Sequence, residues 1–142
     1  MPVYTIGYAG FTINGFIAEL KKYAVNYLID LRAKPYSEYF TDYDKNYLSY
    51  TLKEHNIQYS SLCIEEDAIP DLSLCLAENL SLSGIKEFGL QIQNLQEKGW
   101  EIVLMCSEQD PSLCLRSLTF SRHLHEIGLQ TFHIAPNLPL YT

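Results

Sequence analysis

The sequence predicts an α/β fold: a single three-layer domain with a mostly parallel central sheet of about five strands and helices on both faces. Two observations lead to this prediction. Short apolar runs, typical of buried strands, alternate along the chain with longer segments whose apolar residues recur at helical spacing. The 142 residues also contain no linker, internal repeat or low-complexity tract, so we expect residues 1–142 to form one domain.

The first half of the chain supplies three strands and two helices of this pattern. Residues 3–6 form the first apolar run, and Thr12 stands where the N-cap of a following helix is expected. The apolar side of that helix is Ile13, Phe16, Ile17 and Leu20. Residues 27–29 predict a second buried strand, Asp44 caps a second helix, and residues 58–62 predict a third strand.

The second half continues the alternation after a segment that is harder to interpret. We expect residues 63–80 to be a long loop with some local helix. A helical series follows it, and Gly99 is a natural end for that helix. The series is Ile85, Phe88, Ile92 and Leu95. Residues 101–105 predict the clearest strand, Asp110–Pro111 a helix start, and residues 131–134 a last strand.

Composition and charge restrict the classes of partner. The net charge is −7 and the chain has only three arginines, so extended nucleic-acid binding is not expected. No run approaches the roughly 18 apolar residues of a membrane span. The N-terminus does not resemble a signal peptide, which predicts a cytoplasmic location. A small-molecule ligand is the expected partner, and no pattern names a cofactor or an oligomeric state.

The carboxyl ends of the predicted strands indicate where a ligand site is expected. In parallel α/β sheets, ligands bind at these ends, where the connecting loops gather. This rule selects residues 7–10, residues 30–39, the long loop after the third strand, and residues 106–111. Reactive and polar residues are concentrated in these segments.

The last of these segments and the first turns of the helix predicted after it carry the candidate catalytic residues, which are Cys106, Glu108 and Arg116. A cysteine near a helix N-terminus and a guanidinium has a lowered pKa and thiolate character. Glu108 would then act as a general acid or base. Alternatively, Cys106 is a small apolar residue that closes the strand, and Glu108 is a solvated carboxylate. A third possibility is a redox switch in which Cys106 pairs reversibly with Cys114.

Two familiar cysteine sites do not fit this segment. A tyrosine-phosphatase loop is short and rich in glycine, whereas Cys106 and Arg116 are far apart and no glycine lies between them. A metal site built from Cys106, Cys114 and a histidine has no recognisable spacing, so no metal is expected.

The first two segments supply most of the candidate ligand-binding residues, which are Gly7, Tyr8, Asp30, Arg32 and Ser37, and Cys114 is added from the helix predicted after the last segment. Gly7 lets the backbone approach an anion closely. Asp30 and Arg32 adjoin a buried strand and need partners, which predicts either a structural ion pair or a ligand role. Some of the nearby tyrosines would stack on a planar ligand, while packing accounts for most of them. These tyrosines are Tyr8, Tyr36, Tyr39 and Tyr43.

Three blocks together resemble the DUF488 family, whose function is not assigned. The blocks are residues 5–10, the run Asp30-Leu31-Arg32 with Pro35 and Ser37, and residues 99–116. The last contains the pattern Cys106-x-Glu108-x-x-Pro111-x-x-Cys114-x-Arg116. The resemblance implies an α/β fold.

The chain departs from the family pattern at two places. Leu115 stands where the family signature usually has a histidine, and residues 62–67 replace a segment that tends to contain glycine. If the histidine serves proton transfer, this chain has lost or changed that step. The alternative to an enzyme is therefore a non-catalytic binding or regulatory module.

Overall fold

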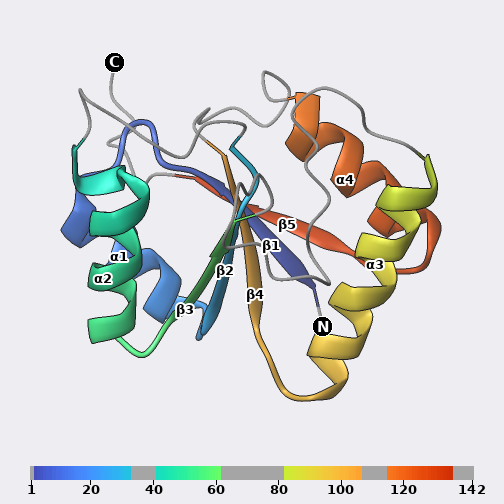
Figure 1. Cartoon of the computed structure of the whole chain (residues 1–142), viewed down its shortest axis with the longest axis horizontal. Coiled ribbons are helices and arrows are strands. Elements are labelled where there is room, and N and C mark those ends of the chain that lie inside the picture. The colour runs from blue at the N-terminus through green and yellow to red at the C-terminus, as the bar shows by residue number, and fades with distance from the viewer. Residues whose placement is uncertain (1, 33–40, 62–81, 107–114, 136–142) are drawn as a thin grey trace.

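A computed structural model describes residues 2–32, 41–61, 82–106 and 115–135 of the chain. Strands and helices alternate along it (Figure 1). The strands are β1 (Val3–Gly7), β2 (Tyr27–Asp30), β3 (Gln58–Ser61), β4 (Ile102–Cys106) and β5 (Thr131–Ile134). The helices are α1 (Ile13–Lys22), α2 (Lys45–Glu54), α3 (Leu82–Glu97) and α4 (Leu115–Glu126), with a 3-10 turn η1 (Thr41–Tyr43) before α2.

The five strands form one sheet in the order β3-β2-β4-β1-β5, and every neighbouring pair is parallel. β4, late in the sequence, therefore lies between β1 and β2. The register pairs Gly7 with Cys106 and Asp30 with Met105. The predicted α/β class is confirmed, and the carboxyl ends of all strands meet at one edge of the sheet.

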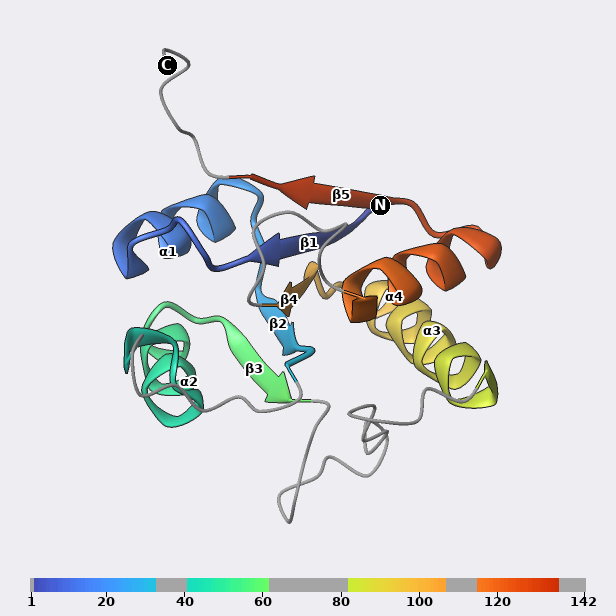
Figure 2. The same cartoon turned by 90° about the horizontal axis from the view of Figure 1, so that it is seen from above.

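Helices cover both faces of the sheet, as Figures 1 and 2 show, with α1 and α2 on one side and α3 and α4 on the other. The strand pleat sends alternate side chains to each face. Leu28 and Val103 pack in a core with Phe16 of α1 and Leu48 of α2, among others. Neighbouring strand residues supply the other core, which is Ile29, Leu104, Phe88 and Ile92 of α3, and Leu124 of α4, among others.

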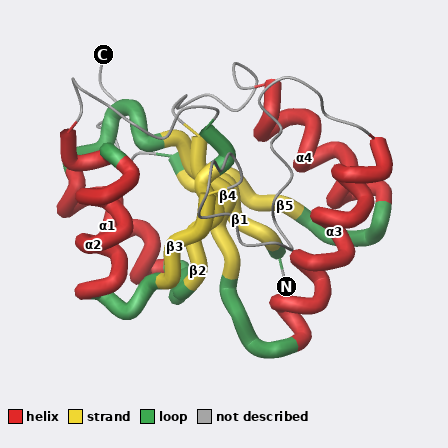
Figure 3. Tube along the Cα trace, in the orientation of Figure 1, coloured by secondary structure: helices red, strands yellow, loops and turns green. Residues whose placement is uncertain are grey.

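The four described helices end in the same way, and short loops then lead to the next strand (Figure 3). In each, two successive amides after the helix donate back to carbonyls in its last turn, which is the Schellman arrangement. The first of the two residues has a positive φ each time. These residues are Ala24, Asn56, Gly99 and Gly128, with φ of 58°, 61°, 96° and 89°. The next residue is apolar and begins the return to the core.

The predicted elements are confirmed, with small shifts at their ends. Thr12 is the N-cap of α1 and accepts a hydrogen bond from the Gly15 amide at 3.1 Å. Cys106, predicted to begin a connecting segment, is instead the last residue of β4. The loop expected over residues 63–80 and the helix start at Asp110–Pro111 lie outside the described residues. Within the described part of the chain, no helix has the length and apolar character to span a bilayer.

Candidate functional site

The carboxyl ends of β1, β4 and β2 are tied together by backbone hydrogen bonds. The Tyr8 amide, one residue beyond β1, donates to the Cys106 carbonyl at 3.1 Å. On the other side of β4, the Leu31 amide donates to the Met105 carbonyl at 2.8 Å. Three of the four segments selected from the sequence therefore begin side by side.

The buried Asp30 and Arg32 and the partly buried Tyr59 form a polar cluster at this edge, which we call the Asp30 cluster. The Asp30 side chain is inaccessible to solvent, and Arg32 is only 7% exposed. Arg32 donates from Nε to both carboxylate oxygens, at 3.0 and 3.1 Å, and from Nη2 at 2.7 Å. Its backbone amide donates to Oδ1 at 3.0 Å. The predicted Asp30–Arg32 pairing is thus present as a bidentate ion pair.

Tyr59 completes the hydrogen bonding of the carboxylate from the neighbouring strand. Its hydroxyl donates to Asp30 Oδ2 at 2.6 Å, and both carboxylate oxygens then accept at least two hydrogen bonds. A buried carboxylate is stable only when hydrogen bonds and an opposite charge replace its lost hydration. The sequence analysis did not find Tyr59. Only the pairing of β2 with β3 brings it to Asp30, and the sequence does not reveal strand order.

The electrostatics of the Asp30 cluster fix the protonation of its members. Burial alone would lower the pKa of Arg32, but the hydrogen bonds and charge of Asp30 outweigh it and raise the pKa above its usual value. Burial, and then the negative charge of Asp30, raise the pKa of Tyr59 well above its usual value. At neutral pH the cluster therefore holds a guanidinium cation and a neutral, donating phenol.

Arg32 packs against the ring of Tyr8, which in turn stacks on the ring of Tyr43. The guanidinium carbon lies 5.4 Å from the centroid of the Tyr8 ring, a cation–π distance. Tyr8 stacks on Tyr43, with centroids 4.4 Å apart and planes 15° apart, and the Tyr43 hydroxyl donates to the Phe11 carbonyl at 3.1 Å. Both tyrosines are buried. Of the tyrosines considered for ligand stacking, these two stack on each other.

Cys106 and the Asp30 cluster are adjacent along the edge but belong to different faces of the sheet. Asp30 follows the alternation of Leu28, which faces α1 and α2. Cys106 follows the alternation of Leu104, which faces α3 and α4, and its residue is 4% exposed. A ligand that contacts both groups must therefore lie across the edge of the sheet and not on one face.

The remaining predicted residues are only partly covered by the structure. Arg116 lies in α4, and α4 packs against β4 on the side that Cys106 faces. Ser37, Glu108 and Cys114 lie outside the described residues. Among the described residues, no three side chains of histidine, cysteine, aspartate or glutamate gather closely enough to hold a metal ion.

A family comparison matches the part of the chain that contains the Asp30 cluster. The matching family model is described as a domain of unknown function, DUF488, and it covers residues 12–63. This confirms the predicted DUF488 resemblance. The match runs from the N-cap of α1 to just beyond β3, so it includes Asp30, Arg32 and Tyr59, whereas the pattern around Cys106 lies beyond it. No curated protein and no solved structure matches the chain.

Proposed function

We propose that this DUF488-like protein binds a small anionic or nucleotide-like ligand across the carboxyl ends of β1, β2 and β4. Arg32 and Arg116 would hold the anion, and Gly7, Tyr8, Ser37 and Cys114 would line its site. The observation that carries the proposal is the Arg32 guanidinium, buried at the carboxyl end of β2 beside the ends of β1 and β4. This is the edge at which parallel α/β sheets bind ligands.

The geometry of Arg32 suits anion binding because the side chain is already held in place. Asp30 accepts from Nε and Nη2, and Tyr8 lies beneath the guanidinium. Arginine has five N–H donors, and the hydrogen bonds to Asp30 use those on Nε and Nη2. A ligand oxygen that accepts from another of these N–H groups would bind at little further cost in side-chain entropy.

Cys106 would supply the chemistry if the protein is an enzyme. Its thiolate would form a bond to an electrophilic atom of the ligand, and the leaving group would depart with its electron pair and take a proton from Glu108. The N-terminal end of α4 and Arg116 would favour the thiolate. In the redox alternative, Cys106 and Cys114 would form a disulfide by thiol–disulfide exchange with a small-molecule disulfide, which is reduced to two thiols, and excess small-molecule thiol would reverse the step.

A non-catalytic binding module is the second candidate function, and two observations favour it. Leu115 replaces the histidine of the family pattern, and the Cys106 residue is buried to the extent of an ordinary core cysteine. The rate at which iodoacetamide alkylates Cys106, followed by peptide mass spectrometry at neutral pH, separates the two. Fast alkylation supports the enzyme, and slow alkylation supports the module.

Binding of inorganic phosphate, sulfate and adenosine 5′-monophosphate to matched variants tests the ligand site. For each anion that binds the original chain, we expect Arg116→Ala to lower the affinity by about tenfold. This is the effect of losing one charge-assisted hydrogen bond. Arg122→Ala is the control, since Arg122 is exposed on the same helix. If Arg116→Ala and Cys106→Ser both leave the binding of every tested anion unchanged, the proposal fails.

A further inference from the structure

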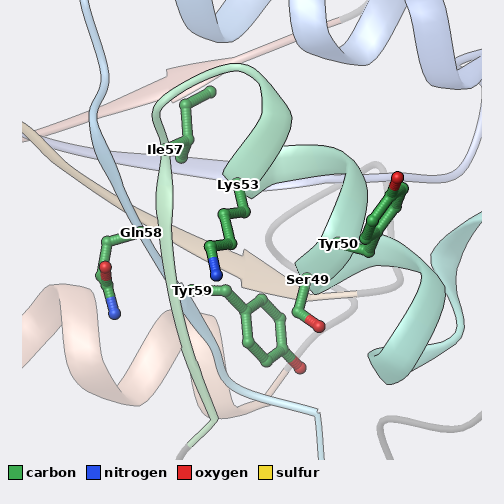
Figure 4. Close-up of a pocket in the computed structure, with 6 residues that line it drawn as sticks. All are labelled: Ser49, Tyr50, Lys53, Ile57, Gln58 and Tyr59. Carbon is green, nitrogen blue, oxygen red and sulfur yellow. The ribbon is translucent and has the colours of Figure 1, made fainter.

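A separate groove lies at the outer edge of the sheet, between α2 and the edge strand β3 (Figure 4). Its volume is about 320 Å³, which is within the range of small-molecule sites. Its lining residues are Ser49, Tyr50 and Lys53 of α2, Ile57 just before β3, and Gln58 and Tyr59 at the start of β3. The groove is thus built by two consecutive elements of the chain.

The side chains around the groove combine one cation with aromatic and hydroxyl groups. Among the described residues that line the groove, Lys53 is the one with a positive charge, and it is exposed. Figure 4 shows the Lys53 and Ser49 side chains extending from α2 toward Tyr59, whose ring points away from Lys53, while Tyr50 is directed away from these three. Ile57 is 3% exposed and provides an apolar wall. One ammonium group neutralises a single negative charge, such as that of one carboxylate.

Tyr59 offers the groove its ring and not its hydroxyl. The hydroxyl donates to Asp30 at 2.6 Å and is therefore committed to the Asp30 cluster. A ring in this position packs well against a planar, apolar group. Tyr50, which is 63% exposed, adds a second ring at the groove.

From these contacts we infer that the groove between α2 and β3 binds planar aromatic monocarboxylates, with the carboxylate on Lys53 and Ser49 and the ring against Tyr59. This site is distinct from the proposed anion site, which lies at the carboxyl edge of the sheet. The two are linked by one side chain, because Tyr59 lines the groove and also donates to Asp30.

The experiment is a fluorescence titration of the full chain with 2-naphthoate, with neutral 2-naphthamide and ring-free acetate as comparison probes. We expect 2-naphthoate to bind at least about tenfold more tightly than either comparison probe, since each lacks one of the two interactions. Lys53→Gln should weaken 2-naphthoate binding by about tenfold. Lys45→Gln, at the start of the same helix and outside the groove, should not change it.

The inference is overturned if 2-naphthoate binds no more tightly than 2-naphthamide, or if Lys53→Gln binds it unchanged. Phosphate binding by Lys53→Gln should remain intact, so failure of the groove and failure of the anion site are distinguishable.

Discussion

At the scale of single residues, the Asp30 carboxylate is the shared hydrogen-bond acceptor of the Asp30 cluster at the carboxyl edge. It is inaccessible to solvent and accepts hydrogen bonds from the Arg32 backbone, the Arg32 side chain and the Tyr59 hydroxyl. The sequence predicted that Asp30 and Arg32 need partners, because charged residues beside a buried strand rarely stay unpaired. It could not predict Tyr59, which comes from a different strand.

Substitution of Asp30 tests the strength of this cluster. We expect Asp30→Asn to lower the free energy of unfolding by about 3–5 kcal/mol, because it leaves the Arg32 cation buried without its counter-charge. Urea unfolding followed by circular dichroism measures this change. Asp42→Asn, at an exposed position in η1, should change the free energy by less than about 0.5 kcal/mol. A loss of under about 1 kcal/mol for Asp30→Asn would contradict the expected charge pairing.

The raised pKa values of Tyr43 and Tyr59 lead us to expect a loss of stability at alkaline pH. Burial raises the pKa of both Tyr43 and Tyr59 above the unfolded value of about 10. The folded state then holds protons that the unfolded state releases, so stability is complete below pH about 10 and falls above it. Each tyrosine contributes a slope of about 1.4 kcal/mol per pH unit. Urea unfolding between pH 9 and 11 should show a shallower slope for Tyr59→Phe than for the original chain, and an identical slope would be inconsistent with a buried Tyr59 phenol.

At the scale of secondary-structure elements, apolar spacing made most helices and strands predictable, because each element buries one face or stripe. The helix ends were only half predictable. Glycine at Gly99 indicates a helix end from the sequence alone, since glycine readily adopts positive φ. Ala24 and Asn56 occupy equivalent positions after α1 and α2, and Ala24 in particular carries no sequence signal for this conformation.

The same substitution, alanine to glycine, is expected to change the stability of the protein in opposite directions at the end of α1 and inside it. Ala24 has φ of 58°, which is strained for a residue with a Cβ, so Ala24→Gly should stabilise the protein by about 1 kcal/mol. Ala18→Gly, at an exposed position inside α1, should destabilise it by about 1 kcal/mol through lost helix propensity. Thermal unfolding of both variants measures the difference, and a fall in Tm for Ala24→Gly would contradict the strain at this position.

At the scale of the whole molecule, the strand order decides how the candidate residues relate to one another. Sequence alone predicted that polar residues after β1, β2 and β4 would meet, because parallel strands share one carboxyl edge. It did not predict that Asp30 and Cys106 would face different layers of helices. That relation follows from the register of β4 between β1 and β2, which is a long-range property of the sheet.

The central claim is that the ends of β1, β2 and β4 form one anion site, and an NMR titration tests it most directly. Uniformly ¹⁵N-labelled protein would be titrated with inorganic phosphate and adenosine 5′-monophosphate while amide shifts are followed. We expect the amides of Gly7, Tyr8, Leu31, Arg32 and Cys106 to shift together with one dissociation constant. Shifts confined to residues 49–59, or no saturable shift at the strand ends, would contradict the claim.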